Sequence, residues 1–223
     1  MSGSPGSSAP YDAAALREAA GLALRPGGLA LTDRAMAVCP LPPEARLLDV
    51  GCGAGATVEH LQGRGFRITG LDPSPALLEA ARQRNAGLSL REGRAEHLPM
   101  ADRSLDGVLC ECVLSLLDAP RRALAEFRRV LHPGGWLILS DLYERTGDAS
   151  AGPQALAGLL ADWDFRLVLW EDHTRLLQEL AARLLLAGCS LDRLCRQAMP
   201  RPGYYLAVAR LAPPCQPGDC HAG

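Results

Sequence analysis

The stretch Leu47-Leu48-Asp49-Val50-Gly51-Cys52-Gly53-Ala54-Gly55 decides the fold that this chain can adopt. Its first half is apolar and strand-like, its second half is a glycine-rich turn, and a helix-compatible segment follows. Glycines let backbone N–H groups approach a ligand closely, and a helix start favours anionic or polar groups. Asp72, about twenty residues further on, is placed to bind ribose hydroxyls. The sequence therefore predicts a site for a nucleoside cofactor.

Asp49, the acidic residue in the strand, discriminates between two kinds of nucleoside cofactor. Gly51, Gly53 and Ala56 also satisfy a dinucleotide fingerprint, so their spacing alone leaves a nicotinamide enzyme open. Asp49, however, would repel a pyrophosphate and attract a cation. S-adenosylmethionine carries a sulfonium and an ammonium group and no phosphate, so Asp49 favours it. A tight strand-to-helix turn without a ligand is the remaining interpretation of the glycines.

Composition narrows the possible partners. The chain has 223 residues, 48% of them hydrophobic, and a formal net charge of -2. It contains no lysine, and its arginines are scattered rather than clustered, which argues against a nucleic-acid groove. No apolar run is long enough to cross a membrane, and no signal-peptide pattern is found at the N-terminus. We therefore expect a cytoplasmic protein, in which the eight cysteines are free thiols, metal ligands or redox groups.

Strands and helices alternate from residue 46 onward, which predicts a parallel α/β sheet. Strands are predicted over 46–50, 66–71, 88–91, 105–110, 136–142, 165–170 and 204–211. Helices are predicted over 12–24, 54–61, 154–160 and 174–187, and after the capping residues Thr32, Ser74 and Asp118. Residues 1–10 are predicted to be disordered, 11–211 to form one domain, and 212–223 to form a tail.

Five motifs in order resemble those of the class I S-adenosylmethionine-dependent methyltransferases, in the branch that includes quinone and metalloid methyltransferases. They are Leu48-Asp49-Val50-Gly51-Cys52-Gly53-Ala54-Gly55, Gly70-Leu71-Asp72-Pro73-Ser74, Ala95-Glu96-His97-Leu98-Pro99, Ser104-Leu105-Asp106 and Arg129-Val130-Leu131-His132-Pro133-Gly134-Gly135. The resemblance implies a Rossmann-like, doubly wound sheet of seven strands, mostly parallel with an antiparallel hairpin at one edge. It also implies lid helices over 11–43, a cofactor-binding core over 46–142 and substrate-side elements over 150–211.

The cofactor site is expected at the carboxyl ends of the strands. The candidate cofactor-binding residues are Asp49, Gly51, Cys52, Gly53, Gly55, Asp72, Pro73, Ala95 and Cys110. Asp49 is expected to face the methionine end and Asp72 to accept hydrogen bonds from both ribose hydroxyls. Arg94 stands where relatives usually carry an Asp that accepts from the adenine amino group, and arginine has only donors. Either the Ala95 N–H or stacking by Arg94 is then expected to hold adenine.

The sequence says less about the methyl acceptor than about the cofactor. Methyl transfer depends mainly on proximity and orientation, so no catalytic residue is predicted. The segment Cys110-Glu111-Cys112-Val113-Leu114 stands where related enzymes acting on DNA or protein amides carry Asn-Pro-Pro-aromatic, which favours a small-molecule acceptor. The two thiols in it are either packing residues or ligands for a soft metalloid. A thiol-dependent metalloid methyltransferase and a non-catalytic cofactor-binding partner therefore remain as alternatives, and no metal site is predicted.

Overall fold

The computed structural model describes residues 23, 25–146, 152–186 and 199–213. The segment 1–10, all but one residue of the helix predicted over 12–24, and most of the predicted tail lie outside these residues. Among the described residues, no helix is long and apolar enough to cross a membrane.

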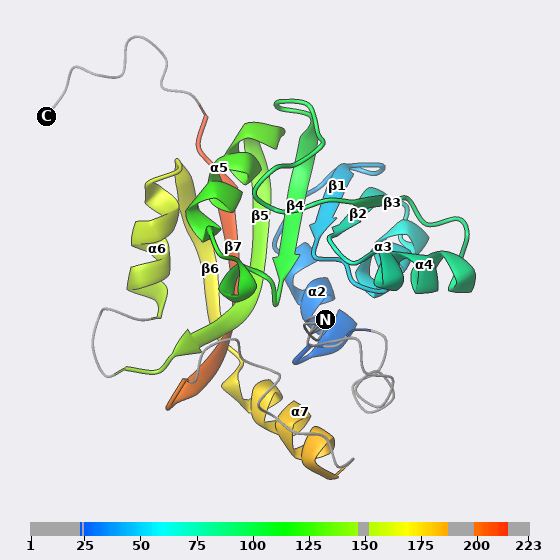
Figure 1. Ribbon diagram of the computed structural model, residues 1–223. Coiled ribbons are helices and arrows are strands. Elements are labelled where there is room, and N and C mark those ends of the chain that lie inside the picture. Colours follow the sequence, from blue (N-terminus) through cyan, green and yellow to red (C-terminus); the bar gives the residue numbers. More distant parts are fainter. Residues whose placement is uncertain (1–22, 24, 147–151, 187–198, 214–223) are drawn as a thin grey trace, which may run out of the picture.

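A sheet of seven strands in the order β3-β2-β1-β4-β5-β7-β6 forms the centre of the molecule (Figure 1). The strands are β1 (Arg46–Val50), β2 (Arg67–Asp72), β3 (Leu90–Glu92), β4 (Leu105–Glu111), β5 (Leu131–Glu144), β6 (Phe165–Asp172) and β7 (Pro202–Leu211). β7 runs antiparallel to both β5 and β6, and the other pairs are parallel. The predicted fold class is confirmed. Val50 pairs with Leu71 and with Cys110, so β1, β2 and β4 end level and their following loops share one edge.

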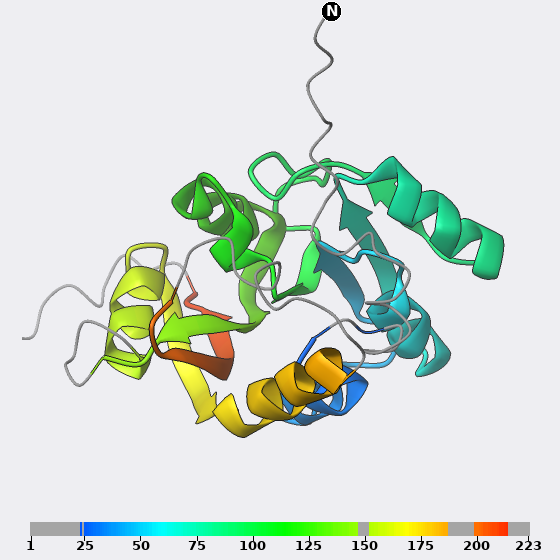
Figure 2. The same cartoon turned by 60° about the horizontal axis from the view of Figure 1, so that its bottom comes forward.

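Helices cover both faces of the sheet. They are α2 (Gly28–Met36), α3 (Ala56–Gly63), α4 (Pro75–Arg84), α5 (Pro120–Val130), α6 (Pro153–Ala161) and α7 (Thr174–Leu186), with a short 3-10 turn η1 (Leu114–Leu116). Neighbouring strand residues point to opposite faces. Leu47 and Leu109 thus pack with α2, α3 and α4, whereas Leu48 and Val108 pack with α5 and α6. Figure 2 shows α2 beside α7 below the carboxyl ends of the parallel strands.

The starts of three helices test the predicted capping residues. Ser74 caps α4 as predicted, because its Oγ accepts the backbone N–H three residues further on at 3.4 Å. Thr32 does not cap α2, which already begins at Gly28. The Thr32 side chain is fully buried and makes tertiary hydrogen bonds instead. Asp118 is not the N-cap of α5 either, since Ala119 takes that position without a side-chain hydrogen bond.

Candidate cofactor site

A cavity of about 270 Å³ opens at the carboxyl ends of β1, β2, β3 and β4. Among the predicted site residues, its lining includes Asp49, Gly51, Cys52, Gly53, Asp72, Pro73 and Ala95. These residues come from three strand ends that the sheet order places side by side. Gly55 and Cys110 do not line the cavity. The structure therefore brings most of the predicted residues together at the predicted edge of the sheet.

The glycine turn owes its shape to backbone conformations that favour glycine. Gly51 has a φ of 74° and Gly53 a φ of 52°, and a side chain at Gly51 would collide with Val113. The backbone N–H groups of Gly51 and Cys52 donate to the Leu71 carbonyl at 2.7 and 3.0 Å. This pairing ties the turn to the end of β2. Outside the cavity, Gly55 is the N-cap of α3, with a φ of 77°.

Asp72 holds the same turn through its side chain. Its Oδ2 accepts the Gly53 N–H at 2.8 Å, and its Oδ1 accepts the Ser74 N–H at 2.9 Å. Asp72 thus lines the cavity and fixes the loop beside it. Its predicted contact with ribose hydroxyls stays a prediction.

Asp49 is a buried carboxylate on the wall of the cavity. Only 3% of the residue is exposed, and no hydrogen bond to its carboxylate is found among the described residues. Burial raises its pKa to about 7; the negative charge of Glu111 adds to this shift, the positive charge of Arg25 opposes it, and Asp72 adds a smaller contribution. Because this anion lies on the cavity wall, a cationic group in the cavity would stabilise it.

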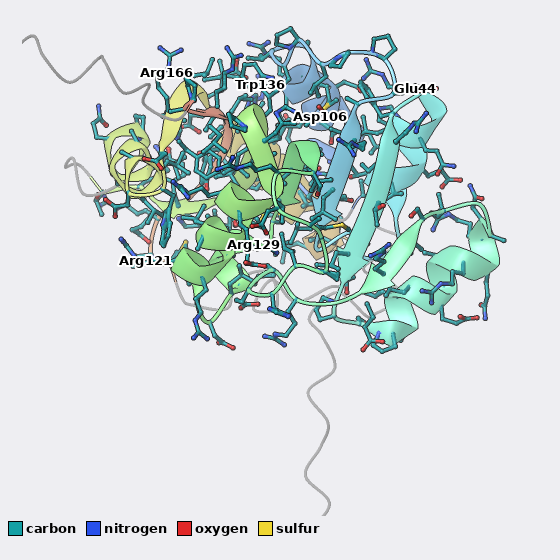
Figure 3. All side chains as sticks on the ribbon, turned by 90° about the horizontal axis from the view of Figure 1, so that it is seen from above. Glu44, Asp106, Arg121, Arg129, Trp136 and Arg166 are labelled. Carbon is teal, nitrogen blue, oxygen red and sulfur yellow. The ribbon has the colours of Figure 1, made fainter. Side chains whose placement is uncertain are left out.

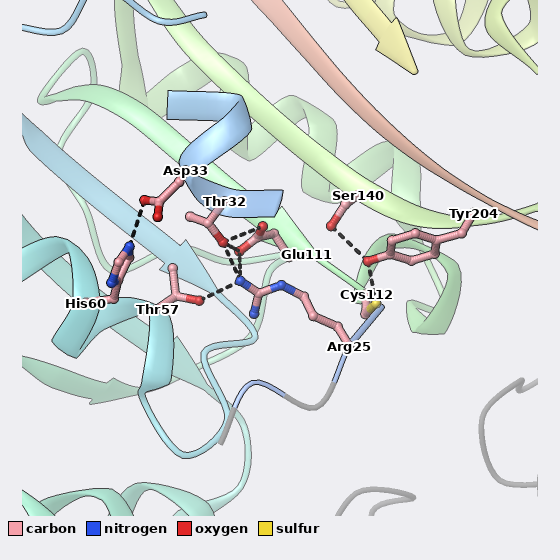
Figure 4. A network of polar contacts seen from close by, with 9 residues as sticks. All are labelled: Arg25, Thr32, Asp33, Thr57, His60, Glu111, Cys112, Ser140 and Tyr204. Atoms are coloured by element: carbon pink, nitrogen blue, oxygen red, sulfur yellow. Dashed lines mark hydrogen bonds and ion pairs between the residues drawn. The ribbon is translucent and has the colours of Figure 1, made fainter. Parts of the chain in front are cut away.

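An ion pair that the sequence does not predict closes the inner end of the cavity (Figure 4). Arg25 Nη2 lies 2.8 Å from Glu111 Oε2, and the two side chains are only 9% and 2% exposed. The same nitrogen donates to the hydroxyls of Thr32 and Thr57 at 2.5 and 3.1 Å, and Thr32 Oγ1 in turn donates to Glu111. Arg25 Nε is buried and has no hydrogen-bond partner among the described residues. It is an unused donor of a side chain that lines the cavity.

The two cysteines at the end of β4 lie in different surroundings. Cys110 is fully buried in the core under α5 and α6 and does not line the cavity, and its cofactor contact stays a prediction. Cys112 follows the strand with a φ of 59°, packs against the opposite core and lines the cavity. Its Sγ lies 3.0 Å from the hydroxyl of Tyr204, which lies 3.0 Å from Ser140 Oγ. Burial raises the pKa of Cys112 to about 12, so the thiol is neutral at ordinary pH.

Comparisons with known proteins agree with this geometry. Residues 48–139 match the family model described as a methyltransferase domain. Over this segment, the predicted resemblance to the class I S-adenosylmethionine-dependent methyltransferases is confirmed. S-adenosylmethionine is the cofactor of this family, so the predicted cofactor is confirmed at the level of the family.

Curated relatives of this chain include methyltransferases that act on different acceptors. An uncharacterized methyltransferase, YodH, from Bacillus subtilis is 38% identical over 51% of this chain and 50% of its own length. Malonyl-[acyl-carrier protein] O-methyltransferase from Serratia marcescens is 37% identical over 48% of this chain and 44% of its own. Arsenite methyltransferase from Halobacterium salinarum is 30% identical over 56% of this chain and 35% of its own. The chain thus spans half or less of the length of these relatives.

A solved structure supports the fold independently. Phosphoethanolamine N-methyltransferase 2 from Haemonchus contortus, in complex with phosphomonomethylethanolamine and S-adenosylhomocysteine, superposes with a TM-score of 0.73. The match covers 89% of this chain and 56% of that one at 17% identity, so it bears on the fold alone.

Proposed function

We propose that this methyltransferase transfers a methyl group from S-adenosylmethionine to a small-molecule acceptor. The observation that carries the proposal is the uncompensated carboxylate of Asp49, on a cavity that also holds the glycine turn and Asp72. A cationic ligand relieves the buried charge, and a ribose supplies donors for Asp72. A ligand with a pyrophosphate would instead place further negative charge beside Asp49.

The charges of the cavity complement those of the proposed cofactor. The charged residues of the lining provide four carboxylates and two guanidiniums, which leave two negative charges when all are ionised; they are Asp49, Asp72, Glu96, Glu111, Arg25 and Arg94. The cofactor carries a sulfonium, an ammonium and a carboxylate, which leave one positive charge. We assign its ammonium group to Asp49 and its carboxylate to the unused Nε of Arg25. Among the other residues of the lining are Gly51, Cys52, Gly53, Pro73 and Ala95.

The protein's contribution to methyl transfer is binding, orientation and exclusion of water. The bound cofactor supplies an electrophilic methyl group on its sulfonium. Val113, Leu116 and Leu117, which follow β4, give the cavity an apolar wall beside Cys112. Such a wall keeps water away and suits a small organic acceptor. These features support a small-molecule acceptor.

The thiol-dependent alternative receives less support from the site. A metalloid ligand pair needs two thiolates within reach of one ion. Here Cys110 and Cys112 pack in different cores, and burial raises the pKa of each thiol. We therefore expect the variants Cys110→Ser and Cys112→Ser to keep methyl-transfer activity. Loss of arsenite methylation in both variants, with cofactor binding intact, would instead establish the thiol-dependent mechanism.

Calorimetry followed by product analysis tests the proposal. The protein should bind S-adenosylmethionine and S-adenosylhomocysteine and should bind NAD more weakly than either. Incubation with methyl-labelled cofactor and a panel of oxygen, nitrogen and sulfur acceptors should then give a labelled product in mass spectrometry. Tighter binding of NAD would contradict the proposal. Cofactor binding without transfer to any acceptor, including arsenite, would favour the non-catalytic partner.

A further inference from the structure

A second cavity lies at the amino end of the parallel strands, at the opposite end of the sheet from the cofactor cavity. Its volume is about 460 Å³, and its lining includes Gly134 near the start of β5, Arg166 near the start of β6 and Arg210 near the end of β7. No described residue lines both this amino-end cavity and the cofactor cavity. The amino-end cavity is therefore a separate site with its own chemistry.

The register of the sheet places the two arginines of this cavity directly opposite each other. Arg166 pairs with Arg210 across β6 and β7, and Arg210 pairs with Trp136 across β7 and β5. Figure 3 labels Arg166 and Trp136 at this end of the sheet. Directly opposite residues of antiparallel strands have Cβ atoms about 5 Å apart on the same face, and like charges there are destabilising. An anion that binds both guanidinium groups would remove this repulsion.

Carboxylates of the described chain do not supply this anion. Neither Arg166 nor Arg210 forms an ion pair among the described residues. Asp164 lies two residues before Arg166, but it is bound by Arg128, whose Nη2 lies 2.6 Å from Asp164 Oδ2. The two cavity arginines thus keep their charges available for a ligand.

Arg210 is held in a fixed position beside the cavity. Its Nε donates to the Gly134 carbonyl at 3.1 Å, and its guanidinium lies over the Trp136 ring, 5.3 Å from the ring centroid. Gly134 has a φ of 83°, and a Cβ at this position would lie 3.4 Å from Arg210 Nη2. The two terminal nitrogens of Arg210 have no hydrogen-bond partner among the described residues. A planar, stacked guanidinium loses little conformational freedom when its remaining donors bind an anion.

We propose that the amino-end cavity binds a phosphomonoester, with the phosphate group between Arg166 and Arg210. Guanidinium groups bind phosphate oxygens through pairs of parallel hydrogen bonds, and two arginines match the double charge of a phosphate ester. Pro133, Leu211 and Pro213 also line the cavity and give it an apolar wall for the organic part of the ester. The inference does not depend on the proposed function, because the cofactor cavity lies at the other end of the sheet.

Calorimetric titration with phenyl phosphate at low ionic strength tests this inference. At about pH 8 the ester is a dianion, since the second pKa of a phosphate monoester is about 6. Phenyl phosphate should bind more tightly than inorganic phosphate, because only the ester has an organic part for the apolar wall. Phenol, which lacks the phosphate, should show no binding at the same concentration.

Substitutions of the two arginines locate the binding site. Arg166→Gln and Arg210→Gln should each weaken binding of phenyl phosphate by at least about tenfold, the value expected for loss of one charge-assisted hydrogen bond. Arg122→Gln is the matched control and should keep the affinity of the wild type. Arg122 is also exposed and without an ion pair among the described residues, but it does not line the cavity.

Melting temperatures give a second readout and check the folding of the variants. Phenyl phosphate should raise the melting temperature of the wild type and of Arg122→Gln, and should have little effect on Arg166→Gln. Arg166→Gln carries the test if Arg210→Gln fails to fold, because Arg210 also binds Gly134 within the chain. No binding of phenyl phosphate, or equal affinity in the wild type and Arg166→Gln, would overturn the inference. Equal affinities for inorganic phosphate and phenyl phosphate would overturn the assignment of an ester.

Discussion

Two carboxylates at opposite ends of the same sheet have pKa values that are shifted in opposite directions. At the amino end, Asp106 accepts the Arg46 N–H at 2.6 Å and lies 2.6 Å from His132 Nε2. Burial pushes its pKa upward, but these hydrogen bonds outweigh burial and the pKa is lowered. At the carboxyl end, the described residues include no such donor to Asp49, and burial raises its pKa to about 7. Figure 3 looks onto the amino end and labels Asp106 there.

The difference separates a group that stabilises the fold from one that requires a ligand. The carboxylate of Asp106 is stabilised within the chain, so its ionised form favours folding. The ionised form of Asp49 is destabilised until a cation enters the cavity. Such perturbed groups are characteristic of functional sites. If this interpretation holds, substitutions at the two ends should have different effects, on ligand affinity at one end and on stability at the other.

The substitution Asp72→Ala is expected to have the largest effect on ligand affinity, and Asp106→Ala is its matched control. Both residues accept a backbone N–H and a second hydrogen bond, but only Asp72 lines the cavity. Loss of one charge-assisted hydrogen bond is worth roughly 1.5–3 kcal/mol, so Asp72→Ala should weaken binding of S-adenosylhomocysteine by at least about tenfold. Asp106→Ala should lower the melting temperature and leave affinity unchanged. Calorimetry and thermal unfolding would contradict the comparison if both variants lost the same affinity.

Protonation of Asp49 is expected to have a smaller effect on the affinity for the cofactor. Its pKa is about 7 in the free protein and should fall when a cation is bound. Affinity for S-adenosylmethionine should therefore be highest above pH 7 and decrease by up to about tenfold per pH unit below it. Calorimetry between about pH 5.5 and about pH 7 measures this while the cofactor's own amino group stays charged.

Asp49→Asn supplies the control for this pH dependence. The variant should bind more weakly than the wild type at pH 7, and its affinity should change little over the same range. Calorimetry of the wild type in two buffers of different ionisation enthalpy should also show protons released on binding near pH 7. An equally steep pH dependence in Asp49→Asn would show that another group titrates. This result would contradict the proposed difference between Asp49 at the carboxyl end of the sheet and Asp106 at its amino end.

Sequence reasoning was strongest where function depends on contiguous residues. The glycine turn, Asp49 and Asp72 lie on a strand-turn-helix unit and the strand after it, and local patterns identify such units. The Arg25–Glu111 ion pair joins residues far apart in the chain, so no local pattern reveals it. Threonine is a common N-cap residue, but the Thr32 side chain instead forms a hydrogen bond with Glu111 of this ion pair. The different surroundings of Cys110 and Cys112 depend on a positive φ at Cys112, which a non-glycine residue rarely adopts.

The smallest expected effect concerns His132 at the amino end. Its hydrogen bond with Asp106 raises the pKa of His132. The stabilisation from this raised pKa is fully present below the unfolded value of about 6.5 and is lost as the pH rises through the folded pKa. The lowered pKa of Asp106 contributes above about pH 3.9 and is lost as the pH falls through its folded value. The pair therefore stabilises the fold most between these limits.

His132→Ala should lower the free energy of unfolding at about pH 6 by no more than about 1 kcal/mol, because the side chain is 38% exposed and solvent screens the pair. The loss should be smaller at about pH 9, where the imidazole of the wild type is neutral. Denaturant unfolding at both pH values measures this difference, and His132→Gln separates the hydrogen bond from the charge. Affinity for S-adenosylhomocysteine should stay unchanged in both variants. A change in affinity would show that the amino end is coupled to the cavity, so that the two ends could not be treated as independent.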